Sequence, residues 1–172
     1  MALTSNFTRQ CVAYSGGVNR LWLVDKADVT SFTLSGGQYT AVTMVSGKVF
    51  KEFEFFDDTC SVRENSSRNE QSGAIMIDRE LEFYLQGMSN THRASLQEII
   101  DSSTCGVIAI VLDNNNTYWV HGYNEKSKRA LKLKTGNVDF GKNLDDNIGA
   151  TVILGNKNNE FSRVFTGTVP TS

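Results

Sequence analysis

The sequence predicts one mainly β domain, an antiparallel β-sandwich or barrel with one flanking α-helix at about residues 90–102. Three observations predict this fold class. Apolar residues recur with a period of two along most of the chain, which is typical of half-buried strands. Only one segment shows helical spacing, and strands do not alternate with helices as in parallel α/β folds. At 172 residues, the chain is expected to form a single domain over 1–172.

The period of two places several strands. The run 18–24 (VNRLWLV) is almost continuously apolar, as in a strand buried on both faces. The runs 38–45 and 49–56 flank Ser46-Gly47-Lys48 and are expected to pair as a hairpin. Residues 74–86 alternate most clearly, with Ile75, Ile77, Leu81, Phe83 and Leu85 on one face and Asp78, Glu80, Glu82 and Gln86 on the other.

The helix is expected from the segment SNTHRASLQEIIDSS. Ser89 or Asn90 can cap its N-terminus, and Leu96, Ile99 and Ile100 lie on one stripe at helical spacing. The segments that follow predict a second hairpin and three short strands, at 107–112 with 117–123 and at 129–135, 148–154 and 161–165. The total of about eight strands predicts a sandwich or barrel with the helix over one open end.

A long polar segment, 57–73, separates two of these strands, and Val62 is its only large apolar residue. Loops longer than about 12–15 residues are uncommon in compact domains unless they are functional or disordered. We expect an extended arm that is ordered against another chain, with a floppy surface loop as the alternative. Deleting Glu64–Ser72 is expected to spare the fold. The residues expected on the arm are Asp57, Asp58, Thr59, Val62, Arg63, Glu64, Arg68 and Glu70.

Charge is unevenly distributed along the chain. A formal net charge of −2 excludes a strongly basic nucleic-acid binder. Residues 57–86 carry seven acids against three bases. One reading is two solvated strand faces, and the other is an acidic strip that meets the basic strip of a neighbouring subunit. The basic strip consists of Lys126, Lys128, Arg129, Lys132 and Lys134.

The sequence contains only partial matches to the motifs of known enzymes. Val138-Asp139-Phe140-Gly141 resembles the magnesium-binding tripeptide of protein kinases, but no glycine-rich loop accompanies it. Ser46-Gly47-Lys48 lacks the first glycine of a phosphate-binding loop, because Val42 stands at that position. His92 and His121 lack metal-binding spacing and are expected to be structural. We therefore expect no enzyme, and no catalytic, cofactor-binding or metal-binding residues.

The cysteines and the hydropathy add two expectations. Cys11, Cys60 and Cys105 are odd in number and widely spaced, so we expect buried or inert thiols and neither a disulfide framework nor a zinc site. The sequence contains no run of 18 apolar residues, which a transmembrane helix would need, so no membrane partner is expected.

Four segments together resemble a known family. They are GGVNRLWLVD at 16–25, EFYLQGMSNTHRASLQEII at 82–100, GVIAIVLDNNNTYWVHGYN at 106–124 and IGATVILGN at 148–156. In this order they resemble the tail structural proteins of tailed bacteriophages. The likeness is greatest to the tail-tube-like and tail-ring subunits of phages of gut bacteria, including the crAss-like group. It runs from about residue 10 to 167 and reflects strand packing and turns.

The resemblance implies a tail-tube type of fold and a structural role in the virion. It implies a homo-oligomeric ring, a hexamer or dodecamer, whose central channel lets double-stranded DNA pass transiently during ejection. Copies of the chain and other tail, neck or portal-associated proteins are the implied partners. The implied location is the virion tail, after assembly in the host cytoplasm. In the tube members a long hairpin reaches neighbouring subunits or rings, and segment 57–73 matches it.

Five acids on the polar faces of long strands are candidates for the channel lumen or for a subunit interface, and the sequence leaves these two open. They are Glu52, Glu54, Asp78, Glu80 and Glu82. One departure from the family is the charged linker Glu125–Arg129, which is longer than expected. The alternative function is a monomeric β-barrel or sandwich that binds a small ligand or glycan. Its site would use Trp22, Trp119, Tyr118 and Tyr123, for which core packing is the competing role.

Overall fold

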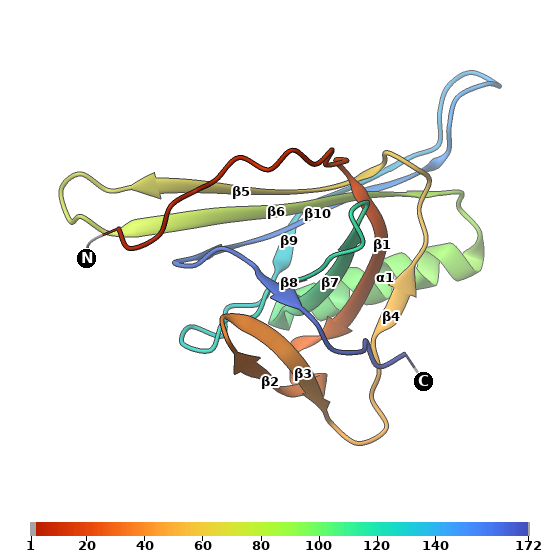
Figure 1. The fold of residues 1–172 in the computed structure, drawn as a ribbon. Helices are drawn as coiled ribbons and strands as arrows, with labels where there is room; N and C mark the ends of the chain where they lie inside the picture. Colours follow the sequence, from red (N-terminus) through yellow and green to blue (C-terminus); the bar gives the residue numbers. More distant parts are fainter. Residues whose placement is uncertain (1–2, 172) are drawn as a thin grey trace.

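The structure, a computed structural model, describes residues 3–171 and is mainly β, as predicted. These residues form eleven strands in two sheets, one α-helix and one short 3-10 helix at Lys26–Asp28 (Figure 1). The helix, α1, spans Asn90–Cys105. The strands are β1 (Val18–Asp25), β2 (Val29–Ser35), β3 (Gln38–Met44), β4 (Lys51–Phe53), β5 (Cys60–Arg68), β6 (Ile75–Gln86), β7 (Val107–Asp113), β8 (Tyr118–His121), β9 (Lys132–Asp139), β10 (Gly149–Asn158) and β11 (Arg163–Phe165).

The larger sheet has seven strands in the order β2-β3-β11-β8-β7-β1-β4. It is mixed, because β11 lies parallel to β3 while the other neighbours are antiparallel. The smaller sheet is antiparallel throughout, in the order β5-β6-β10-β9. Neither order returns to its first strand, so the described chain contains no closed barrel. Of the two expected alternatives, sandwich and barrel, the barrel is therefore wrong, and the antiparallel expectation holds fully only for the smaller sheet.

Two apolar cores lie on opposite faces of β1 and β7. The first fills the space between the two sheets and contains Leu21, Leu23, Leu81, Phe83, Ala109, Val111, Val152 and Leu154. The second lies on the other face, where β2 and β3 cover it, and contains Trp22, Val24, Phe32, Tyr39, Ile108, Ile110 and Phe165. Each fully buried large side chain contributes about 1.5–3 kcal/mol. Burial on both faces explains why the sequences of β1 and β7 are almost continuously apolar.

Helix α1 begins and ends where its sequence dictates. Ser89 caps the N-terminus, since its hydroxyl accepts a hydrogen bond from His92 N at 3.2 Å. Gly106 ends the helix with a φ of +117°, and a Cβ atom there would lie 2.5 Å from the Cβ of Ala130. Leu96 and Ile99 enter the core between the sheets. The helix runs behind β1 and β4 in Figure 1 and extends three residues beyond the predicted range of 90–102.

The predicted hairpin of residues 38–45 and 49–56 is wrong. Strand β3 pairs with β2, which the sequence analysis missed, and with β11. Strand β4 instead pairs with β1, with Leu21 opposite Phe53. The two segments do not pair with each other because residues of the second one enter different cores. Phe50 is buried in the second core, whereas Phe53 packs against the first. The chain between Met44 and Lys51 therefore crosses from one end of the sheet to the other.

The second predicted hairpin is confirmed. Strands β7 and β8 pair antiparallel, with Ala109 opposite His121. Asp113 Oδ1 accepts hydrogen bonds from the backbone N–H groups of Asn115 and Thr117, both at 2.9 Å, so the asparagine-rich turn is held by its own side chains. The later short strands are displaced from their predicted ranges by up to four residues, to the β9, β10 and β11 bounds above.

The three cysteines are unpaired within residues 3–171. Cys60 is buried, and this burial raises the pKa of its thiol to about 12. Cys11 and Cys105 are exposed, so burial holds for only one of the three.

Candidate functional site

Strands β5 and β6 form a hairpin that projects from the body of the molecule (Figure 1). They pair from Cys60 opposite Phe83 as far as Arg68 opposite Ile75. Strand β10 accompanies β6 only as far as Ile77, so the outer end of the hairpin stands alone. The segment 57–73, for which an extended arm was expected and a floppy loop was the alternative, is mainly a strand, because the edge of β6 satisfies its backbone hydrogen bonds without requiring apolar side chains.

The tip of the hairpin is ordered by its own hydrogen bonds. Asn69 Oδ1 accepts hydrogen bonds from the backbone N–H groups of Gln71 at 2.9 Å and Ser72 at 3.2 Å. Gly73 closes the turn with a φ of +72° and donates its N–H to Asn69 O at 2.8 Å. The first residue of β6, Ile75, is 61% exposed beside this turn. The tip is therefore a shaped turn with an apolar side chain next to it.

The residues expected on the arm occupy three different places. Arg68 and Glu70 lie at the tip. Asp57, Asp58 and Thr59 precede β5, at the end of the strand farthest from the tip. The remaining three residues lie in the middle of the strand and alternate in direction, as the pleat requires.

Within β5, Val62 packs against the core between the sheets, and Glu64 also faces inward. Arg63 faces outward, and its guanidinium lies 4.0 Å from a carboxylate oxygen of Glu82. Val62 and Glu64 therefore anchor the hairpin to the body and are not part of its outer surface.

A buried arginine joins this hairpin to β10 and to the loop before β11. Arg79 of β6 is only 2% exposed. Its Nε donates to Glu64 Oε1 at 2.6 Å, Nη1 donates to Asn156 Oδ1 at 3.2 Å, and Nη2 donates to the carbonyl oxygen of Glu160 at 3.2 Å. Three strands and the loop before β11 thus meet at one guanidinium, which we call the root of the hairpin.

Ser162 and His121 complete the root. Ser162 donates its backbone N–H to Glu64 Oε1 at 3.0 Å and its hydroxyl to the same oxygen at 2.5 Å. His121 Nδ1 lies 2.6 Å from the Ser162 hydroxyl. Since the hydroxyl proton is given to Glu64, the imidazole donates its Nδ1–H to Ser162 Oγ. Burial, and next the positive charge of Arg79, lower the pKa of His121 well below its ordinary value.

The hydrogen bonds among Ser162, His121 and Glu64 connect these residues differently from those of a catalytic triad. In a triad the imidazole accepts the serine proton and the carboxylate orients the imidazole. Here the carboxylate of Glu64 binds the serine and Arg79 and does not contact His121. Burial alone would raise the pKa of Glu64, but the hydrogen bond from Ser162 and the charge of Arg79 lower it overall. The arrangement suits a buried ionic network that fixes the hairpin.

The root predicts a particular dependence of stability on pH. Because the folded-state pKa of His121 is lowered, the unfolded state binds a proton below about pH 6.5 that the folded state does not bind. Stability is therefore full above that pH and is lost as the pH falls below it, by roughly 1.4 kcal/mol per pH unit. Glu64, whose pKa is also lowered, adds a further loss under more acidic conditions. Urea unfolding between pH 7 and pH 5 measures this slope.

The two histidines of the chain provide a matched pair for this measurement. His121→Gln should flatten the slope between about pH 6.5 and pH 5. His92→Gln, at an exposed position in the first turn of α1, should retain it. An unchanged slope in His121→Gln would show that the root does not cause the acid sensitivity.

Sequence reasoning missed Arg79, although one signal could have found it. In β6 the odd-numbered positions carry the apolar face, and Arg79 occupies one of them between Ile77 and Leu81. A charged residue on a buried face needs a partner of opposite charge. Glu64 could not be identified as that partner, because its segment was assigned to an arm.

Lys134 is the one member of the basic strip that forms an ion pair within the described residues, whereas four of the five acids do so. Lys134 Nζ lies 2.8 Å from Asp78 Oδ1 and 3.1 Å from Glu80 Oε1. The hydrogen bonds that Lys134 donates to Asp78, and next to Glu80, therefore raise the pKa of Lys134. Arg20 Nε binds Glu52 at 2.6 Å, and Glu82 lies near Arg63 as described above. Of the five acids, only Glu54 forms no ion pair within the described residues.

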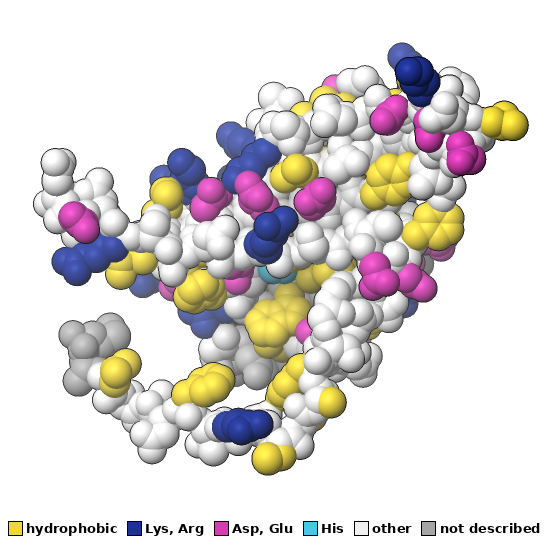
Figure 2. Space-filling model, turned by 90° about the horizontal axis from the view of Figure 1, so that it is seen from above, with side chains coloured by type: hydrophobic (Ala, Val, Ile, Leu, Met, Phe, Trp, Pro, Cys, Tyr) yellow, Lys and Arg dark blue, Asp and Glu magenta, His cyan; other side chains and the backbone are white. Residues whose placement is uncertain are grey.

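The segment 3–17 lies along the outside of the molecule without helix or strand up to Gly16, and every residue in it is exposed. Figure 2 shows the segment standing clear of the body, with hydrophobic side chains along it. Leu3 and Phe7 are fully exposed, and Val12 and Tyr14 are more than half exposed. At its far end the segment is attached through Asn115, which exchanges two hydrogen bonds with Ser15 at 2.8 and 2.9 Å. The described structure thus exposes four large apolar side chains on one extended segment.

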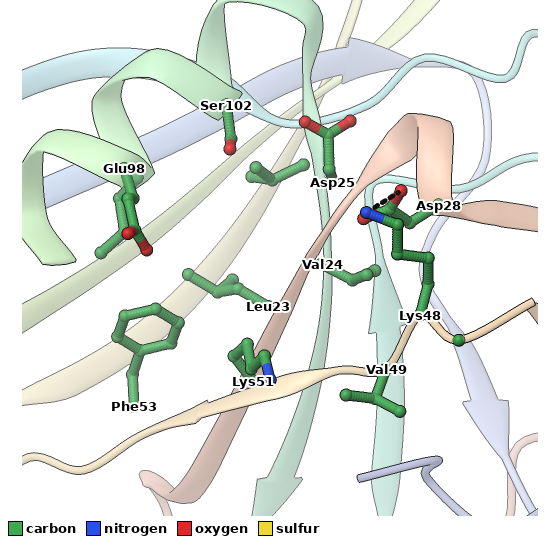
Figure 3. Close-up of a pocket in the computed structure, with 13 residues that line it drawn as sticks. Leu23, Val24, Asp25, Asp28, Lys48, Val49, Lys51, Phe53, Glu98 and Ser102 are labelled. Atoms are coloured by element: carbon green, nitrogen blue, oxygen red, sulfur yellow. Dashed lines mark ion pairs between the residues drawn. The ribbon is translucent and has the colours of Figure 1, made fainter. Parts of the chain in front are cut away.

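A hollow of about 400 Å³ separates α1 from β1 and β4. Figure 3 shows Glu98 and Ser102 of the helix facing Leu23 and Phe53 across it. Lys48 lies on its rim, where its Nζ is 3.7 Å from Asp28 Oδ1. An apolar floor with a charged rim can accept a small apolar group.

The aromatic residues considered for a glycan site serve mostly in packing. Trp22 is buried in the second core, and Tyr118 and Tyr123 pack against that core. Trp119 packs against the first core, and its Nε1 donates to Asp113 Oδ2 at 3.0 Å. They therefore do not form one exposed aromatic platform.

Comparisons of the chain with family models, with curated proteins and with solved structures gave no match. Among residues 3–171, no group of three or more histidine, cysteine, aspartate or glutamate side chains could hold a metal ion. The single helix of the described chain is neither long nor apolar enough to cross a membrane.

Proposed function

We propose that this chain is a structural subunit that assembles with copies of itself into a ring or tube. The observation that carries the proposal is the β5–β6 hairpin, which projects alone yet is fixed at its root by the buried Arg79. Fixing the hairpin in this way requires burial of a charged side chain, and removing a charge from water is energetically unfavourable. The outer end of the hairpin has no third strand beside it within the described residues, and a neighbouring subunit would supply further contact there.

The edges of the sheets support the same proposal. Strand β5 is the outermost strand of the smaller sheet, so one side of its nine-residue backbone has no strand partner within the described chain. Long open edges pair readily with other chains. The exposed apolar residues of segment 3–17 also suit contact with a partner. The extended segment leaves these large side chains in water, and a partner could cover them.

The resemblance to tail structural proteins of tailed bacteriophages suggests which assembly this is. We propose a ring- or tube-forming subunit of the tail or neck, which builds part of the conduit for DNA ejection in the virion. The matched segments include β1, the first turns of α1, the β7–β8 hairpin and the start of β10, which form the body that carries the projecting hairpin. The net charge of −2 suits transient passage of DNA, because strongly positive walls would hold the phosphate backbone.

Size-exclusion chromatography with light scattering and negative-stain microscopy test the proposal. We expect a mass that is a multiple of the chain mass, together with discrete rings or stacked rings. A monomer at all protein and salt concentrations, with no effect of a neck or tail partner, would contradict it.

A second candidate function is binding of a small ligand or glycan. It is favoured by a hollow of about 460 Å³ that is lined by Arg20, Trp22 and Tyr118. The buried Nε1 of Trp22 has no hydrogen-bond partner within residues 3–171, and a ligand acceptor could satisfy it. Quenching of tryptophan fluorescence by sugars, lost in Tyr118→Ala, would support this function over assembly.

A further inference from the structure

Five cationic side chains surround one hollow of about 370 Å³ beside the start of β9. We call it the basic pocket, and its cations are Lys26, Lys128, Arg129, Lys132 and Lys157. Three of them belong to the basic strip of the sequence, and the fold adds Lys26 and Lys157 from distant segments. Lys126 and Lys134 of that strip do not line the pocket.

The charge of the basic pocket is not neutralised by the described chain. No aspartate or glutamate lines the pocket, and none of its five cations forms an ion pair within residues 3–171. Arg129 donates only to the carbonyl oxygen of Lys157, at 3.2 Å. Like charges held this close repel one another, so the pocket is stabilised when an anionic group enters it.

A complementary set of acids lies at the opposite end of the smaller sheet. We call it the acidic end, and it consists of Asp57, Asp58, Asp139, Asp145 and Asp146. The strand register brings these residues to one end, since the start of β5, the end of β6, the start of β10 and the end of β9 are aligned there. In Figure 1 the β9–β10 loop projects at this end.

The two patches are too far apart to neutralise each other within one molecule. Lys132 begins β9 and Asp139 ends it. Seven steps of roughly 3.3 Å separate them by about 23 Å. That distance is nearly three times the Debye length of about 8 Å at physiological ionic strength. Each patch is therefore free to act on another molecule.

We propose that the basic pocket of one copy receives the acidic end of the next copy, so that subunits associate head to tail along the direction of β9 and β10. The inference rests on the proposed assembly and identifies the surfaces that make its contact. Unlike patches at opposite ends of one molecule give a heterologous contact, which closes into a ring or continues as a filament. The acidic loop is held in one conformation, because Asp146 Oδ2 accepts hydrogen bonds from the backbone N–H groups of Lys142 and Asn143, both at 2.7 Å.

The observations favour this partner over a nucleic acid. No aromatic side chain lines the basic pocket, so bases have nothing on which to stack. The chain also carries a net charge of −2, which disfavours non-specific binding of polyanions.

Charge reversal tests the contact, with assembly followed by light scattering and microscopy. Lys132→Glu/Lys157→Glu reverses two of the five charges of the pocket, and Asp57→Lys/Asp145→Lys reverses two of the five at the acidic end. Each double variant should associate at least about tenfold more weakly than the wild type, because the substituted positions then face charges of their own sign. The chain with all four substitutions should assemble again. An equimolar mixture of the two double variants should also assemble, with the copies alternating.

A control variant carries the same change of net charge as the pocket variant, at two lysines that do not line the basic pocket. Lys51→Glu/Lys126→Glu lies on exposed residues outside the basic pocket and should assemble like the wild type. If the wild type assembles and the pocket variant assembles equally well, the inference fails while the proposed function stands. If the wild type never assembles, both fail. If the four-substitution chain does not recover assembly, the two patches do not contact each other and the inference is overturned. If a phosphorothioate oligonucleotide binds the wild type but not the pocket variant, the pocket belongs to a nucleic acid and the inference is likewise overturned.

Discussion

Arg79→Met is expected to lower the free energy of unfolding by about 3–5 kcal/mol, because it leaves the carboxylate of Glu64 buried without its counter-ion. Asn156 Oδ1 and the carbonyl oxygen of Glu160 would each lose a donor as well. Domains of this size are stable by only about 5–15 kcal/mol, so the loss is a large share of the total. Urea unfolding followed by tryptophan fluorescence measures it.

Two further variants show whether the loss of stability in Arg79→Met comes from the unpaired buried charge or from the removal of side-chain contacts. In Glu64→Leu/Arg79→Met both charges are absent, so the double variant should be more stable than the sum of the two single changes predicts. Lys134→Met removes an exposed amine from Asp78 and Glu80 and should cost less than about 1 kcal/mol. A cost for Arg79→Met no larger than that for Lys134→Met would contradict the role of the root.

The elements that the sequence predicted best are those whose burial follows a regular pattern over most of their length. The runs in β1 and β7 are buried on both faces, and β6 is buried on one, so their hydrophobicity reports their environment directly. Helix α1 was also predictable, because its cap, its stripe and its terminal glycine are local signals. These elements form most of the body on which the candidate site stands.

The remaining elements depend on contacts that no local pattern carries. Strand β5 has nine residues, of which Cys60 and Val62 are the only apolar ones, and it is a strand because β6 offers it an edge. Strand β2 combines Phe32 with serines and threonines and so gives a weak signal. The partner of β4 was decided by Phe50 and Phe53 entering different cores. Non-local pairing of this kind cannot be derived from the turn residues between two strands.

The candidate site was predictable in its location but not in its chemistry. The length and polarity of 57–73 identified the hairpin as the feature in need of an explanation. Its buried root was not predictable, because it joins Glu64, Arg79, His121 and Ser162 from four separate segments. The same holds for the basic pocket, where the fold adds Lys26 and Lys157 to the strip and directs Lys134 to intramolecular partners.

Shortening the projecting hairpin is expected to abolish stacking of subunits while sparing the fold. Deleting Glu64–Ser72 is not suitable, because it removes Glu64 and leaves Arg79 unpaired. Replacing residues 67–76 with Asn-Gly instead joins Ser66 to Ile77, which lie opposite each other in the register, through a two-residue turn. The root and the pairing of β6 with β10 then remain intact. The free energy of unfolding should change by less than about 1 kcal/mol, since the residues removed contribute no fully buried side chain.

Assembly should respond far more strongly than stability to this change. If the tip supplies the contact between stacked subunits, the shortened chain should show single rings or monomers by microscopy where the wild type shows longer assemblies. Ile75→Asp, at the exposed apolar residue beside the tip, should weaken association in the same direction, because it would bury a charge at the contact. Ser67→Asp, at a neighbouring exposed position of β5, provides the control for added charge. Wild-type assembly by the shortened chain would assign the contact to another surface, of which segment 3–17 and the open edge of β5 are the next to be altered.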